Sequence, residues 1–449
     1  PSSAPREQPQ RLIRKCIKPQ KTGAAYPAPA CGYKGNNMIE QFTLPNGLRV
    51  LCEQLPHLRS VSMGVWVKAG SILEREHENG LSHLIEHMAF KGTGRRSAKQ
   101  IAQEMDAVGG YLNAATSKLC TCYYAKVIDE NLPLAADILS DIVRFPAIDP
   151  KELDKERNVV LEEISMTDDS PEDVAYDLIA SAMFGKQPLG QTILGPRELI
   201  ASYTREDILA FRARHYSPMN TCVAIAGNFD LNQVKDLMAQ RFGDWTGGAG
   251  EIFPVNAVNQ RPQTLTADKD TEQAHICLGY RGKPLGDADA YPMAVFNSIL
   301  GGGMSSRLFQ RIREESAMAY SVYSAPSAYP HCGDFTIYAA VSPRNVKTVL
   351  AQIDEETSLL VREGATQEEF DMAKAQLKGG FILGQESAYN RMNSMGSNMA
   401  LMNRVITTDE TIRRIEAVTP EDVRRVAAET LGGPRSQAFV GKKIAKYLK

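Results

Sequence analysis

The stretch LSHLIEHMAFKGTG, residues 81–94, places two histidines and a glutamate within five positions of a chain that has only seven histidines. On an α-helix, positions i and i+4 lie on one face about one turn apart, so His83 and His87 can bind one metal ion. Glu86 lies beside them, where a carboxylate can accept a proton from a water whose pKa the metal lowers. A solvated pair of histidines on a helix edge is the alternative.

A hydrolytic metal site needs a third protein ligand and one open position. The helical pattern of residues 152–166 offers Glu156, Glu162 and Glu163. Glu156 and Glu163 lie two turns apart on one face, whereas Glu162 points about 100° away from Glu163. One carboxylate of the shared face can bind the metal while the other supports a histidine. A charged face in solvent is the alternative, and the spacing alone leaves both open.

The overall composition limits the classes of protein to which this chain can belong. A chain of 449 residues with 43% hydrophobic and 23% charged residues is typical of a globular protein with two or more domains. The formal net charge is −2, from 51 basic and 53 acidic residues, so we expect neither nucleic acid nor a membrane as a partner. We also expect a cytoplasmic protein, because no signal-peptide core or membrane-length apolar run occurs. The eight scattered cysteines indicate free thiols in a reducing compartment.

Residues 1–37 stand apart from the rest of the chain. They contain six prolines, seven Lys or Arg residues and a single acid, Glu7, which predicts a disordered basic tail. A mitochondrial targeting segment is the alternative, and it would place the protein in the mitochondrial matrix. The prolines argue against the amphipathic helix that such a segment needs.

The elements that must position the candidate residues follow from turn residues and hydrophobic periodicity. They are a hairpin turn at 45–47, strands at 60–71, 111–127 and 222–230, and helices at 81–91, 97–110 and over much of 131–180. A stretch rich in Gly, Pro, Asn and Gln at 246–265 is the predicted linker, and the same order of elements then restarts. We therefore predict an α+β fold of two homologous α/β domains of about 200 residues, 38–245 and 266–449, related by internal duplication. Their sheets are expected to be antiparallel-rich and flanked by helices.

Several motifs together carry a resemblance to a known family. They are GLSHLIEHMAFKGT around His83, PLGQTILGP at 188–196, HYSPMNTCVAIAGNFD at 215–230 and SSRLFQRIREESAMAYSVYS at 305–324. The chain resembles the pitrilysin and mitochondrial processing peptidase family of zinc metallopeptidases, whose inverted His-x-x-Glu-His motif defines the inverzincins. It is most similar to the short bacterial members and to the processing peptidase β subunit. The resemblance runs over residues 39–435.

The resemblance implies roles for individual residues. His83, His87 and Glu163 would bind one zinc ion per chain, with Glu86 as the general base and Glu156 as a supporting acid near the site.

Further roles implied by the resemblance lie outside this cluster. Arg313 and Tyr320 would reach over the substrate and hydrogen-bond its scissile carbonyl. Asn113 and Ala114 belong to YLNAATS, which resembles the exposed edge strand to which a peptide adds by main-chain pairing. KLCTC follows that strand where the family usually carries charged residues or histidine, so the fine substrate preference is not implied.

The second half lacks the metal motif, so one site per chain is expected. The family builds its active centre between two such two-domain bodies, which implies a homodimer or a heterodimer with a homologous chain. The implied function is a zinc endopeptidase acting on oligopeptides or presequence-like unfolded segments. The alternative is a non-catalytic subunit of a processing-peptidase-like or respiratory assembly. Such scaffolds typically lose the metal set, whereas His83, Glu86, His87 and Glu163 are all present here.

Overall fold

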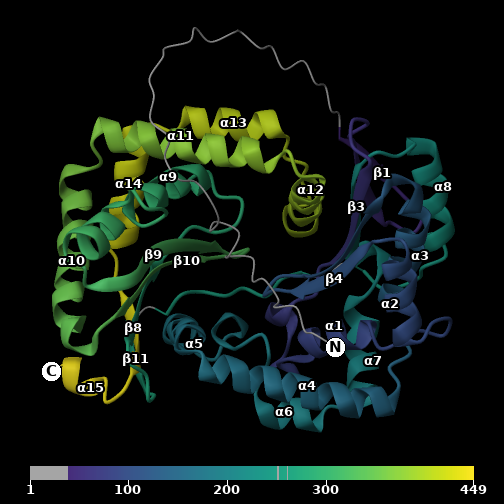
Figure 1. Ribbon diagram of the computed structural model, residues 1–449, viewed down its shortest axis with the longest axis horizontal. Coiled ribbons are helices and arrows are strands. Elements are labelled where there is room, and N and C mark those ends of the chain that lie inside the picture. Colours follow the sequence, from purple (N-terminus) through teal and green to yellow (C-terminus); the bar gives the residue numbers. More distant parts are fainter. Residues whose placement is uncertain (1–38, 250–251, 260, 449) are drawn as a thin grey trace, which may run out of the picture. The chain divides into compact units, whose positions relative to one another are not determined.

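The computed structural model of the protein describes residues 39–249, 252–259 and 261–448. The predicted basic tail at 1–37 lies outside the described residues. Regular structure begins at strand β1, and Figure 1 shows the order of elements along the chain. Across the described part of the chain, each helix is too short or too polar to cross a lipid bilayer.

The first half contains one sheet and the helices that follow its strands. The strands are β1 (Glu40–Thr43), β2 (Arg49–Gln54), β3 (Ser60–Val67), β4 (Tyr111–Thr116), β5 (Thr121–Ile128) and β6 (Thr221–Gly227). The helices are α1 (Leu81–Ala89), α2 (Ala98–Ala107), α3 (Leu132–Arg144), α4 (Pro150–Asp169), α5 (Pro171–Phe184), α6 (Arg197–Ser202), α7 (Arg205–His215) and α8 (Leu231–Phe242). The sheet order is β1-β2-β6-β3-β5-β4, in which only the β2–β6 pair is parallel.

The second half repeats this arrangement without a counterpart of β1. Its strands are β7 (Thr264–Asp268), β8 (Ala274–Arg281), β9 (Ala319–Ala328), β10 (Gly333–Val341) and β11 (Ser436–Gly441). Its helices are α9 (Ala290–Leu300), the π-helix η6 (Phe309–Glu315), α10 (Val346–Glu363), α11 (Gln367–Gly384), α12 (Ala388–Met402), α13 (Thr408–Ala417), α14 (Pro420–Leu431) and α15 (Ala445–Leu448). The sheet order is β7-β11-β8-β10-β9, again with a single parallel pair, β11–β7.

Short 3-10 helices join these elements. They are η1 (Ser71–Leu73), η2 (Glu76–Glu78), η3 (Asp129–Asn131), η4 (Pro188–Gly190), η5 (Pro218–Asn220) and η7 (Pro343–Asn345).

The matching strand orders confirm the predicted α+β fold with antiparallel-rich sheets and an internal duplication. Local caps repeat as well. Thr204 begins α7 with its hydroxyl accepting from the N–H of Asp207, and Thr419 begins α14 in the same way with Asp422. In both capping boxes the carboxylate reaches back to the threonine N–H, which satisfies two donors at the helix start.

Each half places one helix on the sheet of the other half. Helix α12 packs on β3 and β6, while α5 packs on β11 and β8 (Figure 1). Trp66 and Cys222 of the first sheet share a buried cluster with Met392, Met395 and Met399 of α12. The first sheet's own helices cover its other face, so an apolar face that its own half does not cover is buried by this exchange.

The predicted linker is packed against the first half. Within 246–265, Phe253 is buried, and its ring faces the Lys68 ammonium at 4.3 Å. The N–H of Asn259 donates to the carbonyl of Met183 at 2.6 Å. Strand β7 begins at Thr264, before the predicted linker ends.

The cysteines of the described residues are all free thiols. They are Cys52, Cys120, Cys122, Cys222, Cys277 and Cys332. Burial raises the pKa of Cys120 to about 11 and that of Cys52 to about 12. These thiols are therefore protonated and unreactive at neutral pH.

Candidate metal centre

Helix α1 presents both motif histidines next to a buried apolar stripe. Leu84, Ile85 and Met88 are fully buried against the first sheet and its helices, which fixes the rotation of the helix. His87 is buried and His83 is half-buried at the edge of this stripe. The helical spacing brings the two rings together edge to face, with centroids 4.6 Å apart and planes inclined by 60°.

A buried glutamate holds the start of α1. The helix begins after Gly80, which has φ 99° and offers no side-chain cap. The carboxylate of Glu74 takes that role: it accepts from the N–H of Gly80 at 2.9 Å, from the N–H of Ser82 at 2.7 Å and from the amide of Asn79 at 3.1 Å. Burial raises the pKa of Glu74, and these hydrogen bonds oppose the rise. Glu74 therefore anchors the helix that carries the motif.

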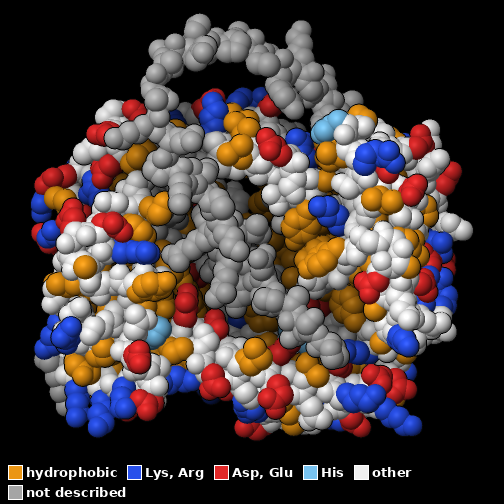
Figure 2. All heavy atoms as spheres, viewed as in Figure 1, with side chains coloured by type: hydrophobic (Ala, Val, Ile, Leu, Met, Phe, Trp, Pro, Cys, Tyr) orange, Lys and Arg blue, Asp and Glu red, His pale blue; other side chains and the backbone are white. Residues whose placement is uncertain are grey.

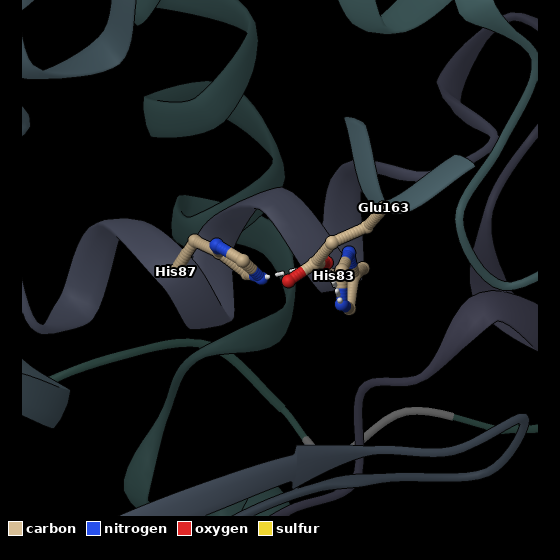
Figure 3. A group of neighbouring side chains, drawn as sticks. All are labelled: His83, His87 and Glu163. Atoms are coloured by element: carbon tan, nitrogen blue, oxygen red, sulfur yellow. Dashed lines mark ion pairs between the residues drawn. The ribbon is translucent and has the colours of Figure 1, made fainter. Parts of the chain in front are cut away.

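Helix α4 supplies the third candidate ligand. The Oε2 atom of Glu163 lies 3.7 Å from Nε2 of His83 and 3.4 Å from Nε2 of His87. Figure 3 shows the three side chains converging from α1 and α4. One ligand atom from each residue can be chosen so that all lie within 4.8 Å of one another. Glu162, the neighbouring candidate, is exposed.

The two separations from Glu163 to the histidines match those between ligands of a tetrahedral metal ion. Ligand atoms about 2.0–2.1 Å from zinc in tetrahedral geometry are about 3.3 Å apart, close to the separations found between Glu163 and each histidine. Two imidazoles and one carboxylate are a donor set that zinc accepts, and a fourth position is left for water or substrate. The side chain of Glu163 is 23% exposed, so the group is reachable from solvent.

Glu156 lies behind His87, on the face of α4 that it shares with Glu163. Its Oε2 atom is 3.0 Å from Nδ1 of His87, and its Oε1 atom is 2.6 Å from Nζ of Lys91. Burial acts to lower the pKa of His87, but the hydrogen bond to Glu156 and the carboxylates of Glu163 and Glu86 raise that pKa to about 9. The negative charge of these carboxylates favours the binding of a cation at this site. The bond at Nδ1 also directs Nε2 of His87 toward Glu163.

Glu86 lies on the same helix and meets the edge strand. The hydroxyl of Thr116, the last residue of β4, donates to Oε2 of Glu86 at 2.5 Å. A carboxylate held in this way has a fixed orientation next to the candidate metal ligands. The arrangement can therefore accept a proton beside a metal ion.

Asn113 and Ala114 lie on β4, at the edge of the first sheet. The N–H of Ala114 donates to Oδ1 of Asn113 at 2.8 Å, and the Asn113 amide donates to the hydroxyl of Tyr111 at 2.7 Å. An added peptide strand would compete for the N–H of Ala114.

Arg313 and Tyr320 form a separate pair in the second half. Arg313 lies on the π-helix η6, and Tyr320 lies on β9. The Arg313 guanidinium is 4.8 Å from the ring centre of Phe309 and 5.6 Å from that of Tyr320. Between them Ala317 has φ 50°, an uncommon left-handed conformation. Short π-helices and such conformations concentrate at functional sites.

Three contributors to the site were not found from the sequence. Lys91 follows His87 by four positions, a spacing that could have placed it on the same side. Thr116 shares a strand face with Ala114, which is also a usable signal. Glu74 precedes the helix by more residues than any standard cap, so no sequence pattern pointed to it.

Two family models match the chain. Residues 49–197 match the family model described as Insulinase (Peptidase family M16). Residues 202–377 match the model described as Peptidase M16 inactive domain. The second match begins before α7 of the first half and ends within α11 of the second half, which lacks the His-x-x-Glu-His motif.

Curated relatives are similar over nearly the whole chain. An uncharacterised zinc protease of Bacillus subtilis is 40% identical over 392 residues, which are 87% of this chain and 95% of the relative. An uncharacterised zinc protease of Streptomyces coelicolor is 40% identical over 417 residues, which are 91% of each.

A solved structure has the same fold. The crystal structure of a protease from Helicobacter pylori superposes with a TM-score of 0.85 at 24% identity, over 90% of this chain and 99% of that chain.

Proposed function

Because this chain belongs to peptidase family M16, as a short bacterial-type member, we propose that it is a zinc-dependent endopeptidase that hydrolyses peptide bonds in oligopeptides and presequence-like unfolded segments. The observation that carries the proposal is the group of His83, His87 and Glu163, with Glu86 on the same helix. When bound there, zinc would polarise the scissile carbonyl and lower the pKa of a water molecule.

Glu86 is the proposed general base. It takes a proton from the attacking water and passes it to the leaving amine, which requires a fixed carboxylate within hydrogen-bond reach of both. The hydroxyl of Thr116 supports this role by holding Oε2 of Glu86. Glu156 supports the site by holding Nδ1 of His87, so that Nε2 stays directed at the ion.

Residues outside the metal helix are proposed to hold the peptide. The outer edge of β4, at Asn113 and Ala114, is paired with no other described strand, and it is proposed to pair with an extended substrate main chain. Arg313 and Tyr320 donate hydrogen bonds to the carbonyl oxygen as negative charge develops on it. The exposed side chain of Tyr320, at 69%, supports a role in contacting another molecule.

The test is cleavage of a library of quenched fluorescent peptides by the purified chain, together with its zinc content. We expect about one zinc per chain, cleavage that a chelator abolishes, and recovery when zinc is added back. The Glu86→Gln variant is expected to keep its zinc and lose at least 100-fold in kcat, as removal of a general base does. Glu162→Gln, an exposed change on α4, is the matched control and should keep full activity.

The non-catalytic alternative gives a different result in the same assay. A scaffold subunit would cut no peptide on its own, with or without added zinc. The complete metal set and the fixed carboxylate of Glu86 support the enzyme over this alternative.

Pairing with a second copy or with a homologous chain is proposed from the family resemblance alone. Light scattering on the purified chain would give the mass of the assembly, for comparison with 49.4 kDa for one chain. A monomer that is fully active would contradict this part of the proposal. A cytoplasmic location in a bacterium stays a prediction.

A further inference from the structure

The face of β4 and β5 that points away from α1 is partly exposed: among the described residues, α12 buries Cys122 of β5, whereas Tyr111 and Ala115 of β4 are exposed. Tyr111, Asn113 and Ala115 share this face of β4, because side chains alternate along a strand. In the register of the sheet they lie opposite Lys126, Tyr124 and Cys122 of β5. The other face of β4 carries Ala114, which is buried, and Thr116, which contacts Glu86 of α1.

Helix α12 covers this side of the sheet over β3, β6 and β2. Its first turn brings Tyr389 to Tyr124, with ring centroids 5.0 Å apart. Tyr111 continues the row, with its centroid 6.1 Å from that of Tyr124. These three residues form a tyrosine shelf that extends from α12 to the free edge of the sheet. Figure 2 shows hydrophobic side chains gathered on the surface between α12 and β4.

The outer end of the shelf is exposed although it is aromatic. The Tyr111 side chain is 54% exposed, while Tyr124 and Tyr389 are half-buried. The hydroxyl of Tyr111 accepts a hydrogen bond from the Asn113 amide at 2.7 Å, which holds the Tyr111 ring in place. Burial raises the pKa of Tyr124, so its phenol is neutral at physiological pH. The shelf is thus an aromatic surface held in place at its exposed end, Tyr111.

We propose that the tyrosine shelf is a specificity site that selects peptides carrying an aromatic side chain near the scissile bond. The inference rests on the proposed function, because it takes the substrate to be a strand added to β4. Side chains of an added strand alternate between the two faces of the sheet. Those on the open face meet the shelf, where aromatic rings pack at centroid distances of about 4.5–7 Å.

The register along β4 limits which substrate positions are read. Thr116 is the residue of β4 that contacts Glu86. Asn113 and Tyr111 precede Thr116 on the strand by three and five residues. At about 3.4 Å per residue, the open end of the shelf is about 10–17 Å from Glu86 along the strand. The preferred aromatic residues therefore occupy one or two substrate positions, two residues apart, within about five residues of the cut. We therefore expect an aromatic preference at one substrate position or at two positions two residues apart, and not at every position of the peptide.

The test uses matched quenched peptides that differ only by Phe or Ala at each scanned position. Wild type is expected to prefer Phe at one position or at two positions two apart. Tyr111→Ala should lose five- to tenfold in kcat/KM for the Phe peptide and less than twofold for the Ala peptide. Tyr111→Phe should keep the preference, because the ring remains. Phe145→Ala, which removes a ring of similar exposure, 52%, beyond the end of α3, is the control and should change neither peptide.

A binding measurement separates this inference from the proposed function. Fluorescence anisotropy of the same peptides on Glu86→Gln does not require turnover. If wild type cuts peptides but Tyr111→Ala loses equally on the Phe and Ala peptides, the specificity site is refuted and the peptidase stands. If wild type cuts nothing but binds the Phe peptide in a Tyr111-dependent way, the specificity site stands and the peptidase does not. Absence of both cleavage and binding overturns both.

Discussion

The hydroxyl of Thr116 donates a 2.5 Å hydrogen bond to Oε2 of Glu86. This contact joins the free edge strand of the first sheet to the helix that carries the candidate metal ligands. In the proposed peptidase, a peptide that adds to β4 is therefore aligned with the general base by the same strand that holds the base.

Thr116→Val removes this hydroxyl and keeps the volume of the side chain. Without it the carboxylate of Glu86 gains rotational freedom, and we expect kcat to fall about tenfold with little change in KM, since a hydrogen bond to a charged group contributes about 1.5–3 kcal/mol. Steady-state kinetics on one quenched peptide measures both constants. Thr116→Ser keeps a hydroxyl and should keep most of kcat. An equal loss of kcat in both variants would show that the hydroxyl does not support Glu86.

Glu156→Gln weakens the support of His87. The amide is neutral and binds Nδ1 of His87 and Nζ of Lys91 less strongly, so zinc affinity is expected to fall 10- to 100-fold. Competition with a fluorescent chelator gives the dissociation constant directly. Glu162→Gln on the same helix is exposed and should change it less than twofold. Similar losses of zinc affinity in the two variants would show that any negative charge on α4 contributes, and not the contact with His87.

Glu74→Ala removes the cap of α1. It leaves the N–H groups of Gly80 and Ser82 without their buried acceptor, and we expect the free energy of unfolding to fall by about 2–4 kcal/mol. Urea denaturation followed by circular dichroism measures this change. Glu76→Ala, exposed in the same loop, should alter stability by less than about 0.5 kcal/mol. Equal stability of the two variants would contradict the capping role.

Two glycine substitutions are expected to have opposite effects. A Cβ on Gly396 of α12 would lie 2.3 Å from atoms of the Trp66 ring, so Gly396→Ala should destabilise the protein by about 1–3 kcal/mol. Gly380 of α11 has no atom within 4 Å of such a Cβ, and Gly380→Ala should stabilise by about 0.5–1 kcal/mol. Thermal unfolding of both variants checks the signs. If Gly396→Ala were neutral, α12 would not be packed closely on the first sheet.

Asp334 makes stability depend on pH away from the metal centre. Burial raises the pKa of Asp334 to about 6, whereas its hydrogen bond with Thr336 opposes the rise. An acid whose pKa is higher in the folded state holds its proton longer there, so folding is favoured at low pH. That advantage is lost as pH rises from about 4 to about 6.

Asp334→Asn removes this titration, and the comparison isolates its effect. Wild type should lose about 2 kcal/mol of unfolding free energy relative to the variant between pH 4 and pH 6. Urea denaturation at several pH values measures the difference. A constant difference across this range would show that Asp334 does not titrate there.

The sequence was sufficient for features that depend on local spacing. Alternation and helical periodicity predicted most strands and helices, although the predicted strand at 111–127 is a hairpin of β4 and β5. The restart of the pattern after the predicted linker predicted the duplication. The i, i+4 pair of His83 and His87 is defined by helix geometry alone, and the face shared by Glu156 and Glu163 is defined in the same way. Local patterns could not predict that α5 and α12 each pack on the other half's sheet, because the packing partner of an apolar helix is not encoded in its periodicity.

What the sequence determined by itself is the set of chemical groups and their order along two elements. It did not determine which glutamate of α4 meets the histidines, nor that Glu156 binds His87 while Glu162 faces solvent. Those outcomes depend on how α4 crosses α1, and that crossing is set by the burial of both helices in one core. The same holds for Thr116 beside Glu86, for Glu74 at the start of α1, and for the three tyrosines. Each of these contacts joins residues distant in sequence, and only tertiary packing decides which distant residues meet.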